Sequence, residues 1–257
     1  MRKILFLFDM DGTTNESGPG IKKSVAIALE KQGITTYKEE QLDLFVGPPL
    51  RQSFMTLFGF TEEQATQGIQ DYRSYYAVQG KFENRMYPGI PELLAHMKEA
   101  GILCGIASSK PEKFVVEILE HYGAAQYFDI VAGASMSEQL VEKPDIIRLA
   151  LKRARELGLL DGSGMVSGFF AGADNTGETE GRAANEALPD VCAGRSEVWM
   201  IGDRSYDVTG AHECGLPVIG VTYGYGSRRE LEEAGADLIA DTVQELERAI
   251  FSIAERT

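Results

Sequence analysis

Two pairs of acidic residues have spacings that could hold a divalent cation. Asp9 and Asp11 are two residues apart, and Gly12 follows them. Asp203 and Asp207 are four residues apart, about one helical turn, so both side chains can face one point. Carboxylate oxygens are ligands that suit Mg²⁺. Taken alone, the first pair also fits a polar turn and the second fits helix capping.

A hydroxyl and a lysine could hold an anion. Ser108 and Ser109 follow the apolar segment 103–107, and a hydroxyl near a helix N-terminus is a good contact for a phosphate oxygen. Lys143 directly precedes Pro144, which can open a helix, and it could bind a phosphoryl group as a cation. Taken alone, the serine also fits an N-cap and the lysine a solvated surface residue.

The surrounding apolar pattern places all of these residues at the ends of strands. The run Ile4–Phe8 is continuously apolar and stops at Asp9, which is typical of a strand buried on both faces of a parallel sheet. Further strands are predicted, with helices between them, at 103–107, 127–132, 198–201, 218–221 and 238–240. This alternation predicts an α/β fold with a Rossmann-like, doubly wound parallel sheet. Ligands bind such sheets at the carboxyl ends of the strands.

The chain is predicted to divide into a core and an insertion. Helical spacing without a convincing strand extends from about residue 15 to residue 86, so we expect a small all-helical domain over 16–86. The α/β core then comprises 1–15 plus 87–257. Residues 161–196 are rich in glycine and acidic side chains, and we interpret them as an insertion loop on the surface of the core.

The composition excludes several classes of protein. The 257 residues are 44% hydrophobic and 25% charged, which is ordinary for a folded chain. A net charge of −14 disfavours binding to a nucleic acid polymer, so an anion site must supply its own positive charge. The three cysteines form no C-x-x-C pair, which suits a reducing compartment. No apolar run is long enough to span a membrane, and we expect a cytoplasmic monomer or homodimer.

The four motifs occur in an order that resembles a known family. D-x-D-G-T at Asp9, then a serine, then a lysine, then G-D-x-x-x-D at Gly202 is similar to the haloacid dehalogenase-like hydrolases. The resemblance covers the chain apart from 161–196, and the helical insertion resembles the small helical cap of that family.

The resemblance implies phosphoryl chemistry. Asp9 would be the nucleophile that forms an aspartyl-phosphate, and Asp11 would protonate the leaving oxygen and then activate water. Members of the family that attack carbon lack the second aspartate, so Asp11 favours phosphoryl transfer over cleavage of a carbon–halogen bond.

The resemblance also implies a ligand set. Mg²⁺ would be bound by the carboxylate of Asp9, the backbone carbonyl of Asp11 and Asp203, with Asp207 as a ligand or as a partner of one. Ser108 and Lys143 would hold the phosphoryl oxygens. The other residues expected to contact the substrate lie in the same two loops, namely Met10, Gly12, Thr13 and Ser109.

Four segments resemble the branch that contains phosphoglycolate phosphatases and 5′-nucleotidases, namely 15–21, 45–50, 107–111 and 223–226. We therefore expect a Mg²⁺-dependent phosphatase acting on a small phosphorylated metabolite, with phosphoglycolate favoured. Arg51 follows the Pro48–Pro49 pair and could bind a carboxylate or phosphate of the substrate, or lie solvated on a helix. Three alternatives stay open: a 5′-nucleotidase, a phosphomutase of the β-phosphoglucomutase kind, and a non-catalytic binding protein with a phospho-acceptor aspartate.

Overall fold

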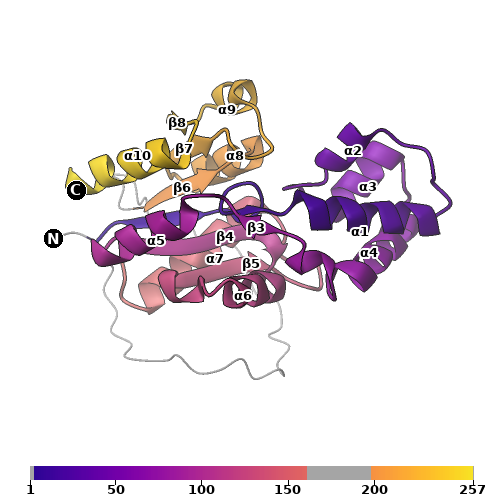
Figure 1. Cartoon of the computed structure of the whole chain (residues 1–257), viewed down its shortest axis with the longest axis horizontal. Helices are drawn as coiled ribbons and strands as arrows, with labels where there is room; N and C mark the ends of the chain where they lie inside the picture. The colour runs from indigo at the N-terminus through magenta and orange to yellow at the C-terminus, as the bar shows by residue number, and fades with distance from the viewer. Residues whose placement is uncertain (1–2, 161–197, 257) are drawn as a thin grey trace.

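The computed structural model describes residues 3–160 and 198–256. It contains a six-stranded parallel sheet with helices on both faces, and a separate group of helices lies at one end of the sheet (Figure 1). The predicted doubly wound α/β fold is confirmed. The predicted insertion loop at 161–196 lies outside the described residues.

The strand order places the first strand in the middle of the sheet. The order is β5-β4-β1-β6-β7-β8, and every pairing is parallel. The strands are β1 (Leu5–Phe8), β4 (Leu103–Pro111), β5 (Ile130–Ala134), β6 (Val198–Gly202), β7 (Val218–Val221) and β8 (Leu238–Ala240). Because β4 and β6 flank β1, the carboxyl ends of these three strands lie side by side at one edge.

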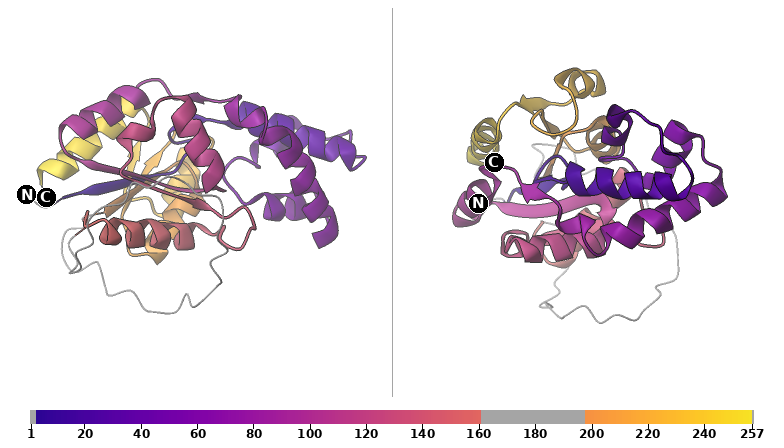
Figure 2. Two further views of the ribbon diagram at one scale, coloured as in Figure 1. Left: turned by 90° about the horizontal axis from the view of Figure 1, so that it is seen from below. Right: turned by 45° about the vertical axis from the view of Figure 1, so that its right-hand side comes forward.

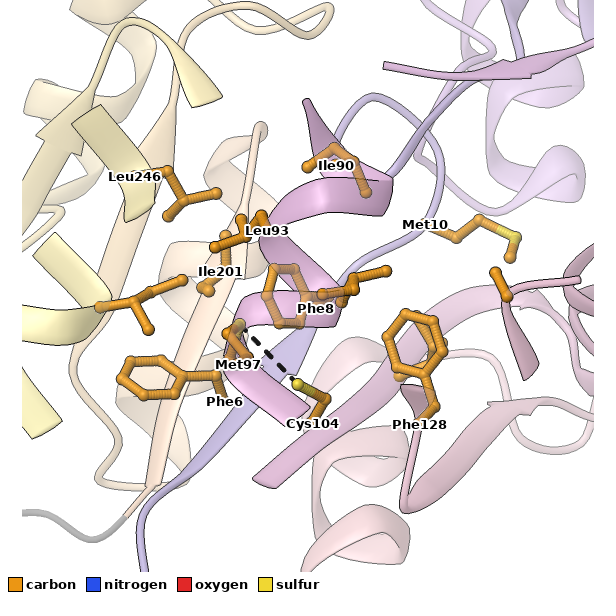
Figure 3. Close-up of a cluster of buried hydrophobic side chains, with 14 of the residues drawn as sticks. Phe6, Phe8, Met10, Ile90, Leu93, Met97, Cys104, Phe128, Ile201 and Leu246 are labelled. Atoms are coloured by element: carbon orange, nitrogen blue, oxygen red, sulfur yellow. Dashed lines mark hydrogen bonds between the residues drawn. The ribbon is translucent and has the colours of Figure 1, made fainter. Parts of the chain in front are cut away.

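Alternate residues of β1 pack on opposite faces of the sheet, as the period of two in a strand requires. Phe6 and Phe8 pack with Leu93 and Met97 in one apolar cluster (Figure 3), whereas Leu5 lies in the cluster on the other face. The first face is covered by α5 (Ile90–Glu99), α6 (Glu112–His121) and α10 (Val243–Glu255). The second is covered by α7 (Lys143–Glu156), α8 (Ser205–Glu213) and α9 (Arg228–Ala234), as the two views in Figure 2 show.

The cap consists of helices that share an apolar core of their own. They are α1 (Gly18–Lys31), α2 (Glu39–Asp43), α3 (Leu50–Phe58) and α4 (Glu62–Tyr76), followed by the short 3₁₀ helix η1 (Gly80–Phe82). The rings of Phe45, Phe54 and Phe60 pack together, with centroids 5.0 and 5.1 Å apart for the two pairs that include Phe54. Phe114 from α6 joins this cluster, so the cap and the core share buried apolar surface.

Two short strands that the sequence did not predict connect the cap to the core. β2 (Asn15–Glu16) pairs antiparallel with β3 (Arg85–Met86), so the two chain crossings are hydrogen-bonded to each other. The expectation of no strand between 16 and 86 is therefore wrong. Strands of two residues are too short to show an alternation of apolar and polar residues.

The strand predicted at 127–132 begins later than expected. Residues Ala125–Tyr127 form the 3₁₀ helix η2, and the strand is Ile130–Ala134. Phe128 is buried in the core from the turn between them. An apolar residue indicates burial, and a residue in a turn can be buried as well as one in a strand. The apolar character of Phe128 therefore did not mark the start of the strand. Separately, none of the described helices combines the length and apolar character that crossing a membrane requires.

Candidate active site

The carboxyl ends of β1 and β6 bring three buried carboxylates together. Asp9 follows β1, Asp203 follows β6, and Asp207 lies in the first turn of α8. One carboxylate oxygen from each residue lies within 4.8 Å of the other two, and all three side chains are buried. Adjacent parallel strands end at the same edge of a sheet, so residues far apart in the sequence meet here.

Lys143 begins α7, and its ammonium group lies among these carboxylates. Nζ lies 2.7 Å from Asp9 Oδ1 and 2.6 Å from Asp207 Oδ1, and it donates to the carbonyl of Ala107 at 3.0 Å. Burial alone would lower the pKa of Lys143, but attraction to Asp207 and Asp9 raises it above its ordinary value. The lysine is therefore charged at neutral pH and holds two carboxylates in place.

Negative charge still exceeds positive charge in this cluster. Burial raises the pKa of Asp203 well above its ordinary value, and repulsion from Asp207 and Asp9 adds to this effect. Burial also raises the pKa of Asp207, to about 6, although Lys143 partly opposes the shift. Buried carboxylate oxygens with uncompensated negative charge form an environment that fits a hard divalent cation such as Mg²⁺.

The loops after β1 and β7 fix the orientation of Asp203. Thr13 Oγ1 donates to Asp203 Oδ1 at 3.3 Å, and the backbone N–H of Tyr225 donates to Oδ2 at 2.8 Å. Gly12 has a φ of +89°, and a Cβ there would lie 2.1 Å from Asp203 Oδ2. Only glycine tolerates both that backbone conformation and that approach. Gly12 and Thr13, which the sequence predicts to contact the substrate, thus contact Asp203 in the structure.

The end of β4 contributes two hydroxyls. The register of β4 against β5 shifts between Ser108 and Pro111, so the chain deviates from regular strand geometry there. Ser108 is buried, and its Oγ accepts from the backbone N–H of Lys110 at 3.3 Å. Ser109 lines a pocket beneath the cap.

Asp11 is paired with a second buried lysine. Lys110 Nζ lies 2.7 Å from Asp11 Oδ2 and donates to the hydroxyl of Tyr76 at 2.7 Å. Asp11 Oδ1 is fully buried and has no hydrogen-bond partner among the residues that the structure describes. The two aspartates of the first motif therefore face different cations, Asp9 facing Lys143 and Asp11 facing Lys110.

A pocket of about 60 Å³ lies between the cap and the core beside Asp11. Most of its lining is aromatic or apolar, and the two cations that reach it are Lys110 and Arg73. The apolar and aromatic lining residues are Ile21, Phe45, Pro48, Pro49, Leu50, Tyr72, Tyr76, Pro111 and Phe114. The pocket thus adjoins the second aspartate and opens toward residues of the cap.

Comparison with known proteins agrees with this geometry. A family model described as "Haloacid dehalogenase-like hydrolase" matches residues 6–157, more than half of the chain. The chain belongs to the haloacid dehalogenase-like hydrolases. A second model, described as "HAD-hydrolase-like", matches residues 176–246.

Three similar proteins extend along most of this hydrolase. A 5′-nucleotidase of Pseudomonas aeruginosa is 35% identical over 225 residues, covering 88% of this chain and 85% of its own. A phosphoglycolate phosphatase of Vibrio parahaemolyticus is 27% identical over 251 residues, covering 94% and 93%. The crystal structure of a predicted phosphatase from Clostridium acetobutylicum has a TM-score of 0.80 and 38% identity, covering 98% and 100%.

Arg51 does not line the pocket of this hydrolase. Its guanidinium donates to Glu138 Oε2 from Nη2 at 2.7 Å and from Nε at 3.0 Å, and to Glu62 Oε2 from Nη1 at 2.8 Å. Both predicted roles of Arg51, a substrate contact and a solvated residue on a helix, differ from this paired arrangement. Arg51 instead ties α3 of the cap to the loop between β5 and α7.

Met10 contributes through its main chain. Its side chain lies in the apolar cluster of the core (Figure 3). Its carbonyl oxygen accepts from the backbone N–H groups of Thr13, Thr14 and Asn15, which tightens the loop after β1. The contact that the sequence predicts between Met10 and the substrate would therefore be made by its backbone, because its side chain is buried in the core.

Sequence reasoning missed Lys110, Tyr76 and Arg73. Lys110 lies in a motif that the sequence singles out, but a single lysine in a polar loop gives no sign that it is buried. Tyr76 and Arg73 lie on α4 three residues apart, on the face of the helix that meets the core. Only the position of the cap over the sheet reveals these contacts.

Proposed function

We propose that this hydrolase is a Mg²⁺-dependent phosphatase that cleaves a small phosphomonoester through an aspartyl-phosphate on Asp9. The observation that carries the proposal is the convergence of Asp9, Asp203 and Asp207 around Lys143. Attack of an anionic nucleophile on an anionic phosphate ester needs positive charge nearby. Lys143 supplies one positive charge, and the surplus of carboxylate oxygens suits a divalent cation that would supply more.

The acidic cluster fits Mg²⁺ by the chemistry of its donors. The carboxylates of Asp9, Asp203 and Asp207 and the backbone carbonyl of Asp11 would hold the ion, because Mg²⁺ prefers oxygen ligands. When bound, the ion offsets the repulsion between a carboxylate nucleophile and an anionic phosphate.

The proposed reaction has two steps. An Asp9 oxygen attacks phosphorus, the bond from phosphorus to the ester oxygen breaks, and Asp11 donates a proton to the departing alkoxide. Asp11 then takes a proton from water as the water oxygen attacks phosphorus, and the bond from phosphorus to Asp9 breaks. Ser108 and Lys143 hold the phosphoryl oxygens during both steps, a kind of contact that commonly contributes about 3–4 kcal/mol to catalysis.

Phosphoglycolate is the substrate that the sequence favours. Its support is the set of segments shared with phosphoglycolate phosphatases, together with the similarity to the Vibrio parahaemolyticus enzyme. A small leaving group also suits the small volume of the pocket.

A nucleoside 5′-monophosphate is the second candidate. The pocket is lined by aromatic side chains, among them Tyr72 and Tyr76, which could pack against a planar base. The similarity to the Pseudomonas aeruginosa 5′-nucleotidase supports the same candidate. The substrate would enter with its phosphate toward Asp9 and its base toward the cap.

A panel of phosphate esters with Mg²⁺ or EDTA tests these proposals. It should contain 2-phosphoglycolate, the common nucleoside 5′-monophosphates and β-glucose 1-phosphate, with Asp9→Asn as the control. We expect Mg²⁺-dependent release of inorganic phosphate from at least one ester. Turnover that survives in EDTA or in Asp9→Asn would contradict the mechanism.

The same panel separates the remaining alternatives. A phosphomutase would convert β-glucose 1-phosphate to an isomer without releasing phosphate. A phospho-acceptor binding protein would keep a phosphoryl label for hours, because it lacks efficient hydrolysis. We do not expect a label that persists for hours, since a pure phospho-acceptor needs neither Asp11 nor a cap. The phosphomutase would share every catalytic residue, so analysis of the products from β-glucose 1-phosphate decides that alternative.

A further inference from the structure

Lys110 is a buried cation to which the proposed mechanism assigns no part. Its side chain is 4% exposed, and it extends from the irregular end of β4, beyond the serine expected to hold a phosphoryl oxygen. Isolated lysines are rarely buried, because desolvating an ammonium group is costly. The ion pair with Asp11 offsets that cost, so the position of Lys110 is tied to the position of Asp11.

This ion pair leaves one oxygen of Asp11 available. Lys110 holds Oδ2 at 2.7 Å, whereas Oδ1 is fully buried and has no hydrogen-bond partner among the described residues. Asp11 also lines the pocket beside the cap. Lys110 thus fixes the carboxyl group by one oxygen and leaves the other without a protein partner, which is the orientation that contact with a departing oxygen requires.

Tyr76 connects this pair to the cap. Its hydroxyl accepts from Lys110 Nζ at 2.7 Å, and the ammonium group lies 4.9 Å from the centroid of its ring. Its ring stacks on Tyr72, with centroids 5.0 Å apart, and meets Phe114 edge-on at 5.4 Å. Tyr76 is therefore held rigidly, and because it lies on α4 it moves with the cap.

We propose that Lys110 and Tyr76 form a positioning pair that holds Asp11 ready for proton transfer only while the cap is closed over the core. Neither residue donates the proton. Lys110 orients Asp11, and Tyr76 makes that orientation depend on the cap. This inference rests on the proposed function, since it assigns a support to the acid of that reaction.

Leaving-group dependence provides a readout that a purely structural role would not change. Esters with acidic leaving groups need little protonation, whereas esters with basic leaving groups depend on the general acid. The experiment measures kcat/KM for a series of substituted phenyl phosphates, from phenyl phosphate to p-nitrophenyl phosphate. This quantity reports steps up to formation of the aspartyl-phosphate, so the later attack of water does not contribute.

Lys110→Met should lower kcat/KM about 100-fold for phenyl phosphate and less than about 10-fold for p-nitrophenyl phosphate, given the usual size of general acid catalysis. Asp11→Asn should show the same steepened dependence. Tyr76→Phe should show it more weakly, about 3- to 10-fold for phenyl phosphate. Tyr75→Phe is the matched control, because it removes a hydroxyl on the same helix that binds Glu83 outside the pocket, and it should leave both esters unaffected.

Equal losses across the series would overturn the inference, because they would indicate a general structural defect. If Lys110→Met fails to fold, Tyr76→Phe decides, and an unchanged leaving-group dependence in that variant would contradict the proposal. A wild-type protein that cleaves no phosphate ester would instead refute the proposed function. The two failures are therefore distinguishable.

Discussion

The two sides of the candidate site are built differently. On the side of Asp9, the charged groups come from the core alone, and Lys143 bridges Asp9 and Asp207 between fixed strand ends. On the side of Asp11, the ion pair between Asp11 and Lys110 also lies within the core, but Lys110 in addition donates to Tyr76 of α4 in the cap. The contacts of the first side therefore do not depend on the cap, whereas the second side includes a contact with it.

On the Asp11 side of the site, a further group of ion pairs connects the cap to the core. Glu138, in the loop between β5 and α7, binds Arg51 at 2.7 Å and Arg73 at 3.2 Å, and both arginines belong to the cap. Glu138 has a φ of +63°, an uncommon conformation for a residue other than glycine. Arg204 adds a contact across the same interface, donating to the carbonyl of Val46 at 2.9 Å.

This difference suggests that the two sides have different functions. The Asp9 side, which we call the fixed side because the core alone forms it, would determine the type of reaction. The side shared with the cap would govern access, protonation of the leaving group and choice of substrate. Substitutions on the fixed side should therefore abolish chemistry for every ester, and substitutions on the shared side should change it selectively.

The largest effect should come from Asp9→Asn. The neutral amide cannot attack phosphorus to form an acyl phosphate, so we expect kcat to fall at least about 1,000-fold with every ester. Steady-state kinetics with two unrelated esters would measure this effect. Residual activity that differs between the esters would argue that the fixed side does not set the reaction.

Lys143→Met should have the next largest effect. It removes the cation that we expect to hold a phosphoryl oxygen, so kcat should fall about 100- to 1,000-fold. It also leaves Asp9 and Asp207 buried without their partner, so the free energy of unfolding should fall by about 3–5 kcal/mol. Urea unfolding measures the second effect, and Lys152→Met, on the exposed face of the same helix, is the control. An unchanged stability would contradict the role of Lys143 in the cluster.

The stability of the metal-free protein should fall as the pH rises from about 4 to about 7. Burial raises the pKa of Asp207 to about 6, so between its ordinary pKa of 3.8 and that value the folded state binds more protons than the unfolded state. The expected contribution is at most about 1.4 kcal/mol per pH unit.

Urea unfolding in EDTA at several pH values would measure this slope. Asp207→Asn should flatten it, and Mg²⁺ should reverse it by favouring the ionised carboxylates. A wild-type slope that Asp207→Asn leaves unchanged would show that the acidic cluster does not titrate in this way.

Glu138→Gln should have the smallest effect and should act through the cap. Ion pairs of this exposure contribute about 0.2–1 kcal/mol each, so weakening two of them should shift cap closure by a few-fold. We expect KM to rise about 3- to 10-fold with little change in kcat. Glu233→Gln, which breaks an exposed pair with Arg229, is the control. A large fall in kcat with unchanged KM would place Glu138 on the chemical side of the site.

The sequence could place Asp9 and Asp203 near each other because each directly follows an apolar strand. Asp9 and Asp203 are marked by the runs that precede them, and strand ends in a parallel sheet must meet at one edge. No comparable pattern in the sequence indicates the positions of Lys110 and Tyr76. Their partners depend on how two domains pack, and Arg51, which the sequence suggested for the substrate, is paired with Glu138 for the same reason.

The most direct test of the account is to identify the residue that carries the phosphoryl group. Borohydride added during turnover with Mg²⁺ reduces an aspartyl-phosphate to homoserine, which peptide mass spectrometry can locate. Homoserine is expected at position 9 of the wild-type protein, and none is expected in Asp9→Asn. Phosphate release without a modified residue 9, or modification at Asp11 or Asp203 instead, would contradict it.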